Sequence, residues 1–592
     1  MNESDTETKN EGDYIRFLGG FALFGLLSAA TAVSGLFFRP VIATVALFFL
    51  VPALFFLFRA IANDDRTARI TLLLSVAVTV VLLVGTTPFL FSGRDQGSIA
   101  EAAVLLSREG GLHFSSTLSD IFFRIYGPGQ ALHFPGFHYA TDGSLVTQFP
   151  IGTVSSFGAF VSLFGTYGLI IGSGGFLVFS LFFLFLVVRD LTDRRFAFGA
   201  FLVGATSFLP LFVARLPLSE NLFLALFLML SFSISRFLRT PNRRILLTSL
   251  FLVALLSIIR IEGVFTFVAT LAILVLSAPG RTYFDRERSE FQLSILVLSL
   301  LFLAANLAMN LALYRSVIGA TLDHITAFSA SVRGDAPAAI ALWRLFLPYG
   351  LFLPFLFGLM GMVFLAVRKR WDALIPAALA LPTFLFLVDP NISPDHPWML
   401  RRFLFSLWPT FMIAFPTALF LLVGHVKQRR AASVLTTAVF AMVILSSLPA
   451  TLTLFSFREY EGLSAQADRL AGKIGERDLL LLDREAVGDP YAIPAAPLRL
   501  SDGRSAVYFF NPADYGKIPT DAFDRIYLLA PESNANGLWS GLPAMLVPVD
   551  TVRFTFERFR PTSIAEPALP ERETVTSESI LYRLDPFPSP AI

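Results

Sequence analysis

The 592-residue chain lacks cysteine altogether. Disulfide bonds, thiolate nucleophiles and cysteine-ligated metal sites are therefore excluded. The spacings typical of histidine zinc sites are missing as well, so such a site is not supported. Charged residues are scarce, at 15% of the chain, and the 46 basic residues are not pooled in one patch. We therefore expect no nucleic-acid partner.

Long apolar runs are abundant instead. Hydrophobic residues make up 55% of the chain, which includes 64 phenylalanines. Runs of about 20 apolar residues can cross a bilayer as helices. The sequence therefore predicts a polytopic α-helical membrane protein with about 13 (11–13) transmembrane helices. They are expected at 15–37, 41–62, 68–92, 166–188, 196–213, 219–236, 245–260, 262–279, 291–313, 347–367, 373–388, 403–424 and 433–455.

Basic residues recur in every second loop, which is the pattern of cytoplasmic loops. The first 14 residues are polar and acidic and lack the features of a cleaved signal peptide. We therefore expect a multi-pass protein of the plasma membrane, with a cytoplasmic tail at 1–14 and a membrane domain at 15–456. The long loop 93–165 and residues 457–592 are then extracytoplasmic.

Two amphipathic helices are expected in the loop 93–165. The first covers 98–108, where Ser98 and Glu101 have the spacing of a capping box, so Glu101 is interpreted as a cap. The second, at 149–164, is expected to lie on the membrane surface.

Residues 457–592 differ in kind, because their apolar runs are short. Buried strands are predicted at 479–483, 506–510 and 525–530, with a helix near 460–475. This pattern indicates a small soluble α/β domain. It contains no phosphate loop or dinucleotide fingerprint, so no chemistry is assigned to it.

Charged residues at the outer ends of the spans are the candidates for function, because ionisable groups are costly there. Arg94 and Asp95 directly follow the apolar run 70–91 and could form an interfacial ion pair; Asp95 could also be a general base towards a hydroxyl acceptor. Ser219 and Glu220 occupy a short turn and could cap a helix. Alternatively, Glu220 faces Asp95 as a second carboxylate and helps to hold a divalent metal ion.

Two further places carry arginine. Arg260 and Glu262 interrupt a long apolar stretch, which indicates a hairpin of two short helices with either a buried ion pair or a phosphate-binding arginine. A proline-rich loop containing His396 leads to Arg401 and Arg402. These adjacent arginines run against the positive-inside trend and require an anionic partner. Lipid headgroups are one possibility, and a lipid-linked phosphate or diphosphate is the other.

Together these features favour an enzyme that takes a group from a lipid carrier and passes it to an acceptor outside the membrane. A transporter would instead place polar groups near mid-membrane, often in two similar halves, and no internal repeat is present. A flippase or transporter for a lipid-linked saccharide is the alternative, together with a non-enzymatic envelope scaffold.

Four motifs, in order, resemble the GT-C superfamily of integral-membrane glycosyltransferases. They are the acidic motif 94–97 before an alanine-rich helix, the surface helix 148–165, the second acidic turn 215–220 and the R-x-E-G hairpin 260–263. The similar branch contains protein O-mannosyltransferases, aminoarabinose transferases and lipopolysaccharide-core sugar transferases. The chain has Glu220 where that family often has Asp, and the WWDYG-type signature of oligosaccharyltransferases is absent.

The resemblance implies an inverting transfer from a polyprenyl-phosphate-linked sugar donor to a glycan, lipid or protein acceptor. Asp95 would be the catalytic base, and Arg260 would stabilise the leaving phosphate. Arg401 and Arg402 join it on the electrostatic argument given above, and Arg94, Glu262 and His396 are the further candidates for binding the substrate or its phosphate. Metal dependence varies in the superfamily, so a divalent ion stays open, with Asp95 and Glu220 as its ligands.

Overall fold

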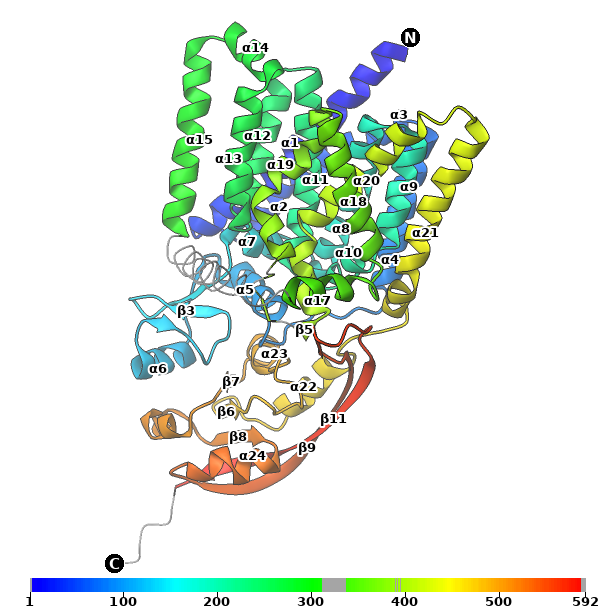
Figure 1. Ribbon diagram of the computed structural model, residues 1–592. Coiled ribbons are helices and arrows are strands. Elements are labelled where there is room, and N and C mark those ends of the chain that lie inside the picture. Colours follow the sequence, from blue (N-terminus) through cyan, green and yellow to red (C-terminus); the bar gives the residue numbers. More distant parts are fainter. Residues whose placement is uncertain (1–2, 311–336, 389, 391, 394, 587–592) are drawn as a thin grey trace, which may run out of the picture.

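A computed structural model describes residues 3–310, 337–388 and 395–586, with 390, 392 and 393 between the last two ranges. A bundle of helices forms one end of the molecule, and a sheet-containing domain forms the other (Figure 1). The end of one expected span, residues 311–313, lies outside the described ranges. The predicted fold class, a polytopic helical protein with a C-terminal α/β domain, is confirmed.

Apolar helices build the bundle, and seven helical stretches among the described residues are long and apolar enough to cross a membrane. The expected number of thirteen spans stays a prediction. The helices are α1 (Glu3–Val33), α2 (Arg39–Val45), α3 (Val51–Asn63), α4 (Arg66–Leu83), α7 (Ile151–Phe164), α8 (Gly168–Leu191), α9 (Arg194–Ala205), α10 (Phe208–Val213), α11 (Ser219–Arg239), α12 (Arg243–Ser257), α13 (Glu262–Leu276), α14 (Ala278–Arg286), α15 (Ser289–Met309), α17 (Pro337–Phe346), α18 (Phe352–Val367), α19 (Ile375–Leu379), α20 (Leu407–Val423) and α21 (Arg429–Phe455).

Helix α11 lies at the centre of the bundle. The share of its apolar window that is buried is 89%, against 17% for α15 and for α21. It packs against α8 and α12. Side-chain caps set the starts of several helices: Asp65 accepts a hydrogen bond from the Ala68 amide at α4, and Asn242 accepts one from the Ile245 amide at α12.

The helix predicted at 68–92 is shorter than its apolar run. α4 ends at Leu83, and residues 84–94 leave the bundle without helical structure. Two other predicted spans are interrupted. The span at 196–213 is divided between α9 and α10, and that at 373–388 is broken into α19 and the 3-10 helices η3 (Trp371–Leu374) and η4 (Leu381–Leu387).

The first long loop contains more structure than expected. It holds α5 (Asp95–Glu109), α6 (Thr117–Tyr126) and a four-stranded antiparallel sheet in the order β1-β4-β3-β2, which was not predicted. The strands are β1 (His113–Phe114), β2 (Gly129–Gln130), β3 (Phe137–Tyr139) and β4 (Leu145–Thr147). These strands are too short to leave a periodic sequence signal.

Two predictions for this loop are wrong. α7 has the expected bounds, but it does not present one face to a membrane surface, because nearly all its residues are buried against α1, α5 and α8. The first helix begins at Asp95 rather than at Ser98, so Glu101 is no cap. Glu101 is buried in the helix interior and forms an ion pair with Arg499 of the C-terminal domain.

The C-terminal domain, residues 457–586 in the structure and called the tail below, contains a five-stranded sheet. Its order is β7-β6-β8-β11-β9. The first three strands are parallel, as β6 pairs with both β7 and β8, and β11 is antiparallel to β8 and β9. The strands are β6 (Leu479–Leu482), β7 (Ser505–Tyr508), β8 (Ile526–Ala530), β9 (Met545–Phe559) and β11 (Arg572–Asp585), and the helices are α22 (Leu463–Ala471), α23 (Ala495–Leu500) and α24 (Glu532–Asn536).

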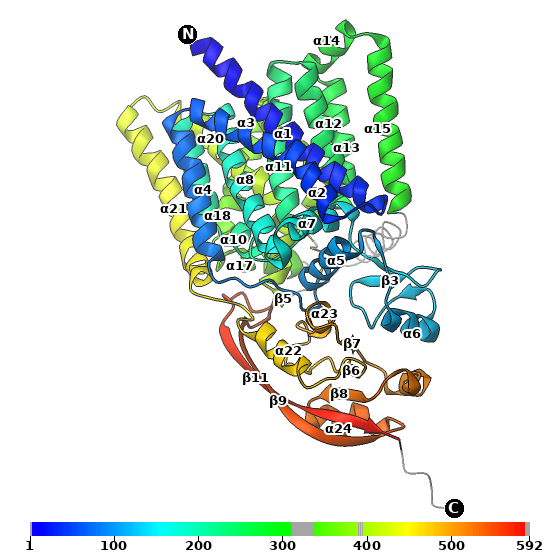
Figure 2. The same ribbon diagram turned by 180° about the vertical axis from the view of Figure 1, so that it is seen from behind.

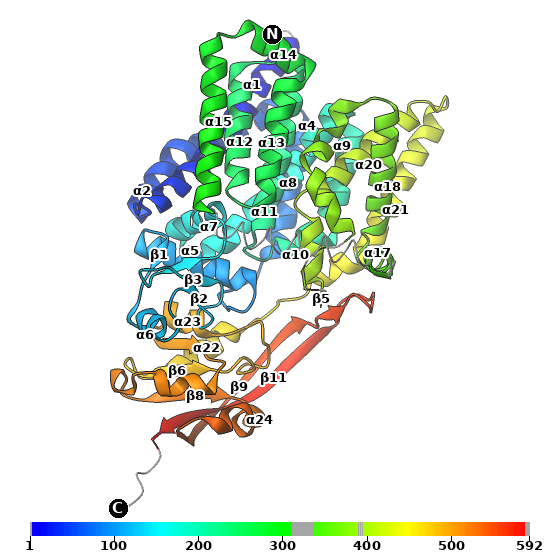
Figure 3. The ribbon, with the colours of Figure 1, turned by 60° about the vertical axis from the view of Figure 1, so that its left-hand side comes forward.

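The three predicted strands and the predicted helix of the tail are confirmed. The long hairpin of β9 and β11 was missed. Alternate residues Val552, Phe554 and Phe556 are buried, so the period-2 signal of a half-buried strand was present there. The turn of this hairpin reaches the bundle, where β10 (Thr562–Ser563) pairs with β5 (Asp395–His396) (Figure 3).

Candidate functional site

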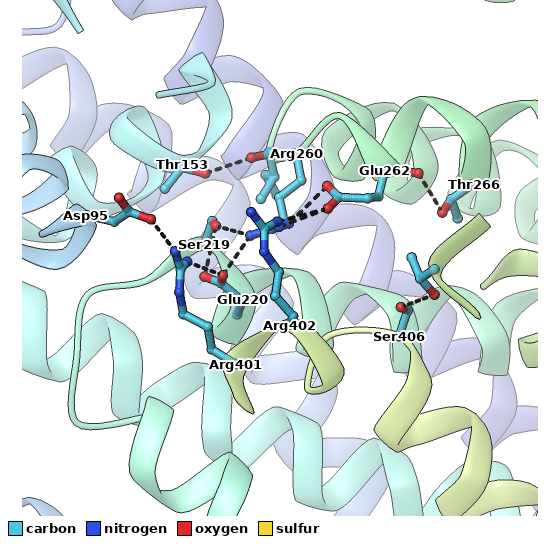
Figure 4. A network of polar contacts seen from close by, with 12 residues as sticks. Asp95, Thr153, Ser219, Glu220, Arg260, Glu262, Thr266, Arg401, Arg402 and Ser406 are labelled. Atoms are coloured by element: carbon cyan, nitrogen blue, oxygen red, sulfur yellow. Dashed lines mark hydrogen bonds and ion pairs between the residues drawn. The ribbon is translucent and has the colours of Figure 1, made fainter. Parts of the chain in front are cut away.

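Four places that are far apart in the sequence meet at the end of the bundle next to the tail. Arg401 is the central residue. Its Nη2 lies 2.5 Å from Oδ2 of Asp95, and its Nη1 lies 2.5 Å from Oε1 of Glu220. Arg401 therefore lies between the two carboxylates and joins them (Figure 4).

The network continues from Glu220 to the helical hairpin. Nη1 of Arg260 lies 2.9 Å from Oε1 of Glu220. The same guanidinium donates to both carboxylate oxygens of Glu262, at 3.1 and 2.9 Å. Arg402 completes the cluster, with Nη1 3.6 Å from Oε1 of Glu262. Three arginines and three carboxylates thus form one connected set.

Each of the three carboxylates lies in the first turn of a helix. Asp95 is the first residue of α5, Glu220 is in the first turn of α11 and Glu262 is the first residue of α13. The helix dipole favours a negative charge at each of these positions. The two neighbouring arginines belong to the 3-10 turn η5 (Trp398–Phe403), which leads into α20.

Ser219 is not the helix cap that the sequence suggests. The N-cap position of α11 is Leu218, and the Ser219 hydroxyl donates to Oε2 of Glu220 at 3.1 Å. The same hydroxyl accepts from Nη1 of Arg260 at 2.8 Å. Sequence reasoning missed this link, because a serine before a glutamate at a helix start also has the pattern of a cap.

Burial distinguishes the members of the cluster. The Glu220 side chain is fully buried and that of Arg401 is 7% exposed, whereas that of Asp95 is 36% exposed. Buried ion pairs are weak contributors to stability because both ions lose their hydration. Asp95 is thus the accessible end of the charged network.

The cluster also contains donor groups without an acceptor. The Nε atoms of Arg401 and Arg402 are buried and have no hydrogen-bond partner among the described residues. Burial lowers the pKa of Arg402 to about 10, and the positive charges of Arg260 and Arg401 act in the same direction. Arg402 is therefore a buried cation that two neighbouring cations repel, and the Glu262 carboxylate 3.6 Å away does not fully offset this.

Arg94 belongs to a neighbouring group rather than to the cluster itself. Its Nη2 lies 2.5 Å from Oδ2 of Asp395, and its guanidinium lies over the rings of Tyr491 and Trp398 at 3.8 and 4.9 Å. Burial acts to lower the pKa of Arg94, but the Asp395 carboxylate outweighs it and holds that pKa above its ordinary value. Arg94 is already paired with the Asp395 carboxylate, so its charge is balanced without a phosphate.

His396, a predicted substrate or phosphate ligand, contacts other parts of the protein through both ring nitrogens. It is fully buried, with Nδ1 2.7 Å from the Tyr349 hydroxyl. Its Nε2 lies 3.2 and 3.1 Å from the carbonyl oxygens of Ser563 and Glu566. Both ring nitrogens have partners within the protein, and a contact of His396 with a phosphate stays a prediction.

The residues present do not fit a divalent metal ion between Asp95 and Glu220. The Arg401 guanidinium contacts both carboxylates and neutralises them. Among the residues that the structure describes, no group of three or more acidic or histidine side chains could hold a metal ion. We therefore derive no step through a metal.

Comparisons with known proteins give structural matches alone. No family model and no curated protein sequence matches the chain. Among solved structures, it is similar to ArnT from Cupriavidus metallidurans in the apo state, at 13% identity and a TM-score of 0.48, over 86% of this chain and 97% of that one. ArnT bound to undecaprenyl phosphate matches at 11% identity and a TM-score of 0.48, over 88% and 98%.

The Archaeoglobus fulgidus oligosaccharyltransferase in complex with Zn and sulfate matches at 13% identity and a TM-score of 0.44, over 78% of this chain and 68% of that one. These low-identity matches concern the fold alone. At such identities and scores, they assign no activity and no residue role to this chain.

Proposed function

We propose that the protein is a membrane glycosyltransferase that moves a sugar from a polyprenyl-phosphate donor to an acceptor hydroxyl, with inversion at the anomeric carbon. The observation that carries the proposal is the ion pair between Asp95 and Arg401. It joins an accessible carboxylate to a buried arginine cluster in which the Nε donors of Arg401 and Arg402 have no partner among the described residues. A base for the acceptor and a binding site for a phosphate are thus adjacent.

The chemistry follows from this adjacency. Asp95 takes the proton of the acceptor hydroxyl as its oxygen attacks the anomeric carbon. The bond from that carbon to the phosphate oxygen breaks, and the lipid phosphate leaves with the electron pair. Arg401 and Arg402 stabilise the negative charge that grows on it, because fixed donors in a site shielded from water need no reorganisation.

Glu220 and Glu262 are positioning residues in this proposal. Glu220 is fully buried and accepts from Arg401, Arg260 and Ser219, so it has no access to an acceptor hydroxyl. Glu262 is engaged by both donors of Arg260. Their charges hold the arginines in place.

We infer that the cluster and the tail lie on the extracytoplasmic side. The basic groups of Arg189, Arg194 and Arg236 belong to the opposite end of the bundle, as expected of a cytoplasmic face. The donor then reaches the site from the membrane, and the acceptor, a glycan, lipid or protein, reaches it from outside.

Sugar transfer by the purified protein in lipid nanodiscs tests the proposal. Labelled undecaprenyl-phosphate sugars are the donors to try first, since ArnT has been solved with undecaprenyl phosphate. Asp95→Asn is expected to lower turnover by about 10²–10⁴-fold, the usual contribution of a general base. The matched control is Asp65→Asn, which removes a carboxylate at the other end of the bundle and keeps an N-cap side chain at α4.

Full turnover in Asp95→Asn would contradict the assignment of the base. A flippase would instead move labelled lipid across proteoliposomes and form no new glycosidic bond. That outcome, with no transfer by the wild type to any acceptor fraction, would favour the alternative function.

A further inference from the structure

The segment that leads to Asp95 is built into the tail. After α4 the chain enters the tail's hydrophobic core, where Phe89 and Phe91 are buried and the Phe89 ring lies 4.9 Å from that of Tyr460. Ser92 and Ile493 then exchange both backbone hydrogen bonds, at 3.1 and 2.8 Å. The path to the proposed base therefore passes through the tail before it returns to the bundle.

The two residues between this bridge and Asp95, Gly93 and Arg94, have little freedom. Gly93 has φ +122°, and a Cβ there would lie 3.0 Å from backbone atoms of Pro490 and Tyr491. Arg94 lies 3.8 Å from the centre of the Tyr491 ring. At Gly97, one turn into α5, a Cβ would lie 1.6 Å from the Phe91 carbonyl oxygen. The first turn of α5 is thus fixed by contact with the bridging segment.

Helix α5 itself rests on the tail. Glu101 forms its ion pair with Arg499 of α23, and Nη1 of Arg108 donates to the Leu500 carbonyl at 2.6 Å. Figure 2 shows α5 between the bundle and α23. The contacts at Ser92, Arg94 and Glu101 lie on both sides of Asp95 in the sequence.

A second part of the tail holds the arginine loop. The turn of the β9–β11 hairpin pairs β10 with β5, so that Ser563 is opposite Asp395 and Thr562 is opposite His396. The His396 ring adds hydrogen bonds to the carbonyls of Ser563 and Glu566. The turn that carries Arg401 begins at Trp398, two residues later.

We propose that the tail is a positioning element that sets the distance between Asp95 and Arg401; this inference rests on the proposed function. Asp95 and Arg401 are 306 positions apart in the sequence. Each lies a few residues from its own contact with the tail. Tyr491 positions the base segment, and His396 positions the arginine loop.

The two contacts have different kinetic signatures. Tyr491→Leu keeps an apolar side chain but removes the ring over which Arg94 lies. It is expected to lower kcat by about 10–100-fold, since a displacement of about 1 Å can cost 10²-fold. Because the arginines are untouched, KM for the donor stays the same. Tyr491→Phe keeps the ring and restores kcat.

His396→Ala removes the hydrogen bonds from the arginine loop to the hairpin turn. KM for the donor is expected to rise, by about tenfold, because the loss of charge-assisted contacts to a phosphate is felt in binding. His396→Gln retains an amide donor and recovers part of the loss. The control is Arg553→Ala, an exposed residue of β9 that contacts Glu578 and leaves both parameters unchanged.

An engineered disulfide provides the decisive experiment on the positioning role. The chain has no native cysteine, so only the engineered pair can form it. The Ser92–Ile493 pair exchanges both hydrogen bonds, and such pairs have Cα atoms about 5.5 Å apart, within the range that a disulfide spans. In the Tyr491→Leu background, Ser92→Cys with Ile493→Cys is expected to restore kcat when oxidised. Reduction is expected to abolish the rescue.

Hydrogen exchange of the amides at 92–98 provides a readout that is independent of activity. It is expected to speed up in Tyr491→Leu and to slow down on oxidation of the cysteine pair. Unchanged kcat and unchanged exchange in Tyr491→Leu would overturn the positioning role. Activity of Asp95→Asn would instead overturn the proposed function, so the two failures are distinguishable.

Discussion

Helix α11 carries a charged cluster at each end, and the two clusters differ in burial. Glu220 in its first turn belongs to the proposed site, where Arg401 and Arg260 are 7% and 9% exposed. Arg236 near its other end pairs with Asp190 at 2.6 Å, and its neighbour Arg239 is 40% exposed. About 24 Å of helix separates the two, at 1.5 Å per residue.

The difference shows what each cluster can do. At the far end, arginines reach solvent while they tie helices together, as Arg194 does with Asp65 at 3.1 Å while 67% exposed. Such pairs suit a cytoplasmic face and contribute little individually. At the near end the arginines are buried, and the Nε donors of Arg401 and Arg402 lack a partner among the described residues, as does Nε of Arg236 at the far end. Burial of the arginines therefore distinguishes the two clusters, and buried arginine donors suit the anion of the proposed function.

The largest expected effect concerns the sidedness of the two clusters. Single cysteines at Arg553 in the tail and at Arg194 at the far end occupy positions of similar exposure, 68% and 67%. A membrane-impermeant maleimide added to intact cells is expected to label Arg553→Cys and to leave Arg194→Cys unlabelled. The reverse labelling pattern would place the proposed site on the cytoplasmic side and contradict the sidedness inferred for the two clusters.

The next effect compares two arginine deletions. Arg401→Ala leaves the carboxylates of Asp95 and Glu220 without their shared partner. It is expected to lower the free energy of unfolding by about 3–5 kcal/mol and to abolish transfer. Arg194→Ala, measured in parallel by thermal unfolding in detergent, is expected to change stability by no more than about 1 kcal/mol and to keep activity. Equal effects of the two deletions would remove the distinction between the clusters.

The smallest effect is expected from the removal of Arg402, which should weaken lipid binding without lowering thermal stability. Arg402→Ala is expected to weaken the binding of undecaprenyl phosphate by about tenfold, because a charge-assisted contact contributes about 1.5–3 kcal/mol. The apparent melting temperature should not fall, since Arg402 is repelled by Arg260 and Arg401 in the empty site. A control deletion, Arg239→Ala, should leave lipid binding unchanged. Lower stability of Arg402→Ala with unchanged lipid affinity would show that Arg402 is structural.

Part of the site could be predicted because charges at the ends of apolar spans are costly and therefore conspicuous. Asp95, Glu220, Arg260 and Arg401 were all found in this way, and the structure brings them together. The pairing itself could not be read from the sequence. That Arg401 is the residue between the two carboxylates depends on how four helix ends pack.

Several residues have a role that local sequence patterns do not indicate, because each contacts a partner that is distant in the sequence. Glu101 has the spacing of a cap, but its partner is Arg499, 398 positions later. Arg94 was assigned to phosphate, but Asp395 holds it. His396 was a candidate ligand, and its Nε2 donates to the carbonyl oxygens of Ser563 and Glu566 in the hairpin turn. Local sequence patterns predict a helix start or a loop well, but they do not predict which distant part of the chain packs against it.

The measurement that tests the account most directly compares turnover and lipid binding in Asp95→Asn. In the proposed mechanism Asp95 is the base and the arginines bind the phosphate, and Asp95 pairs with Arg401 when no phosphate is bound. Turnover should therefore be lost, whereas affinity for undecaprenyl phosphate should be equal to that of the wild type or higher. Lost affinity together with lost turnover, or retained turnover, would contradict the account.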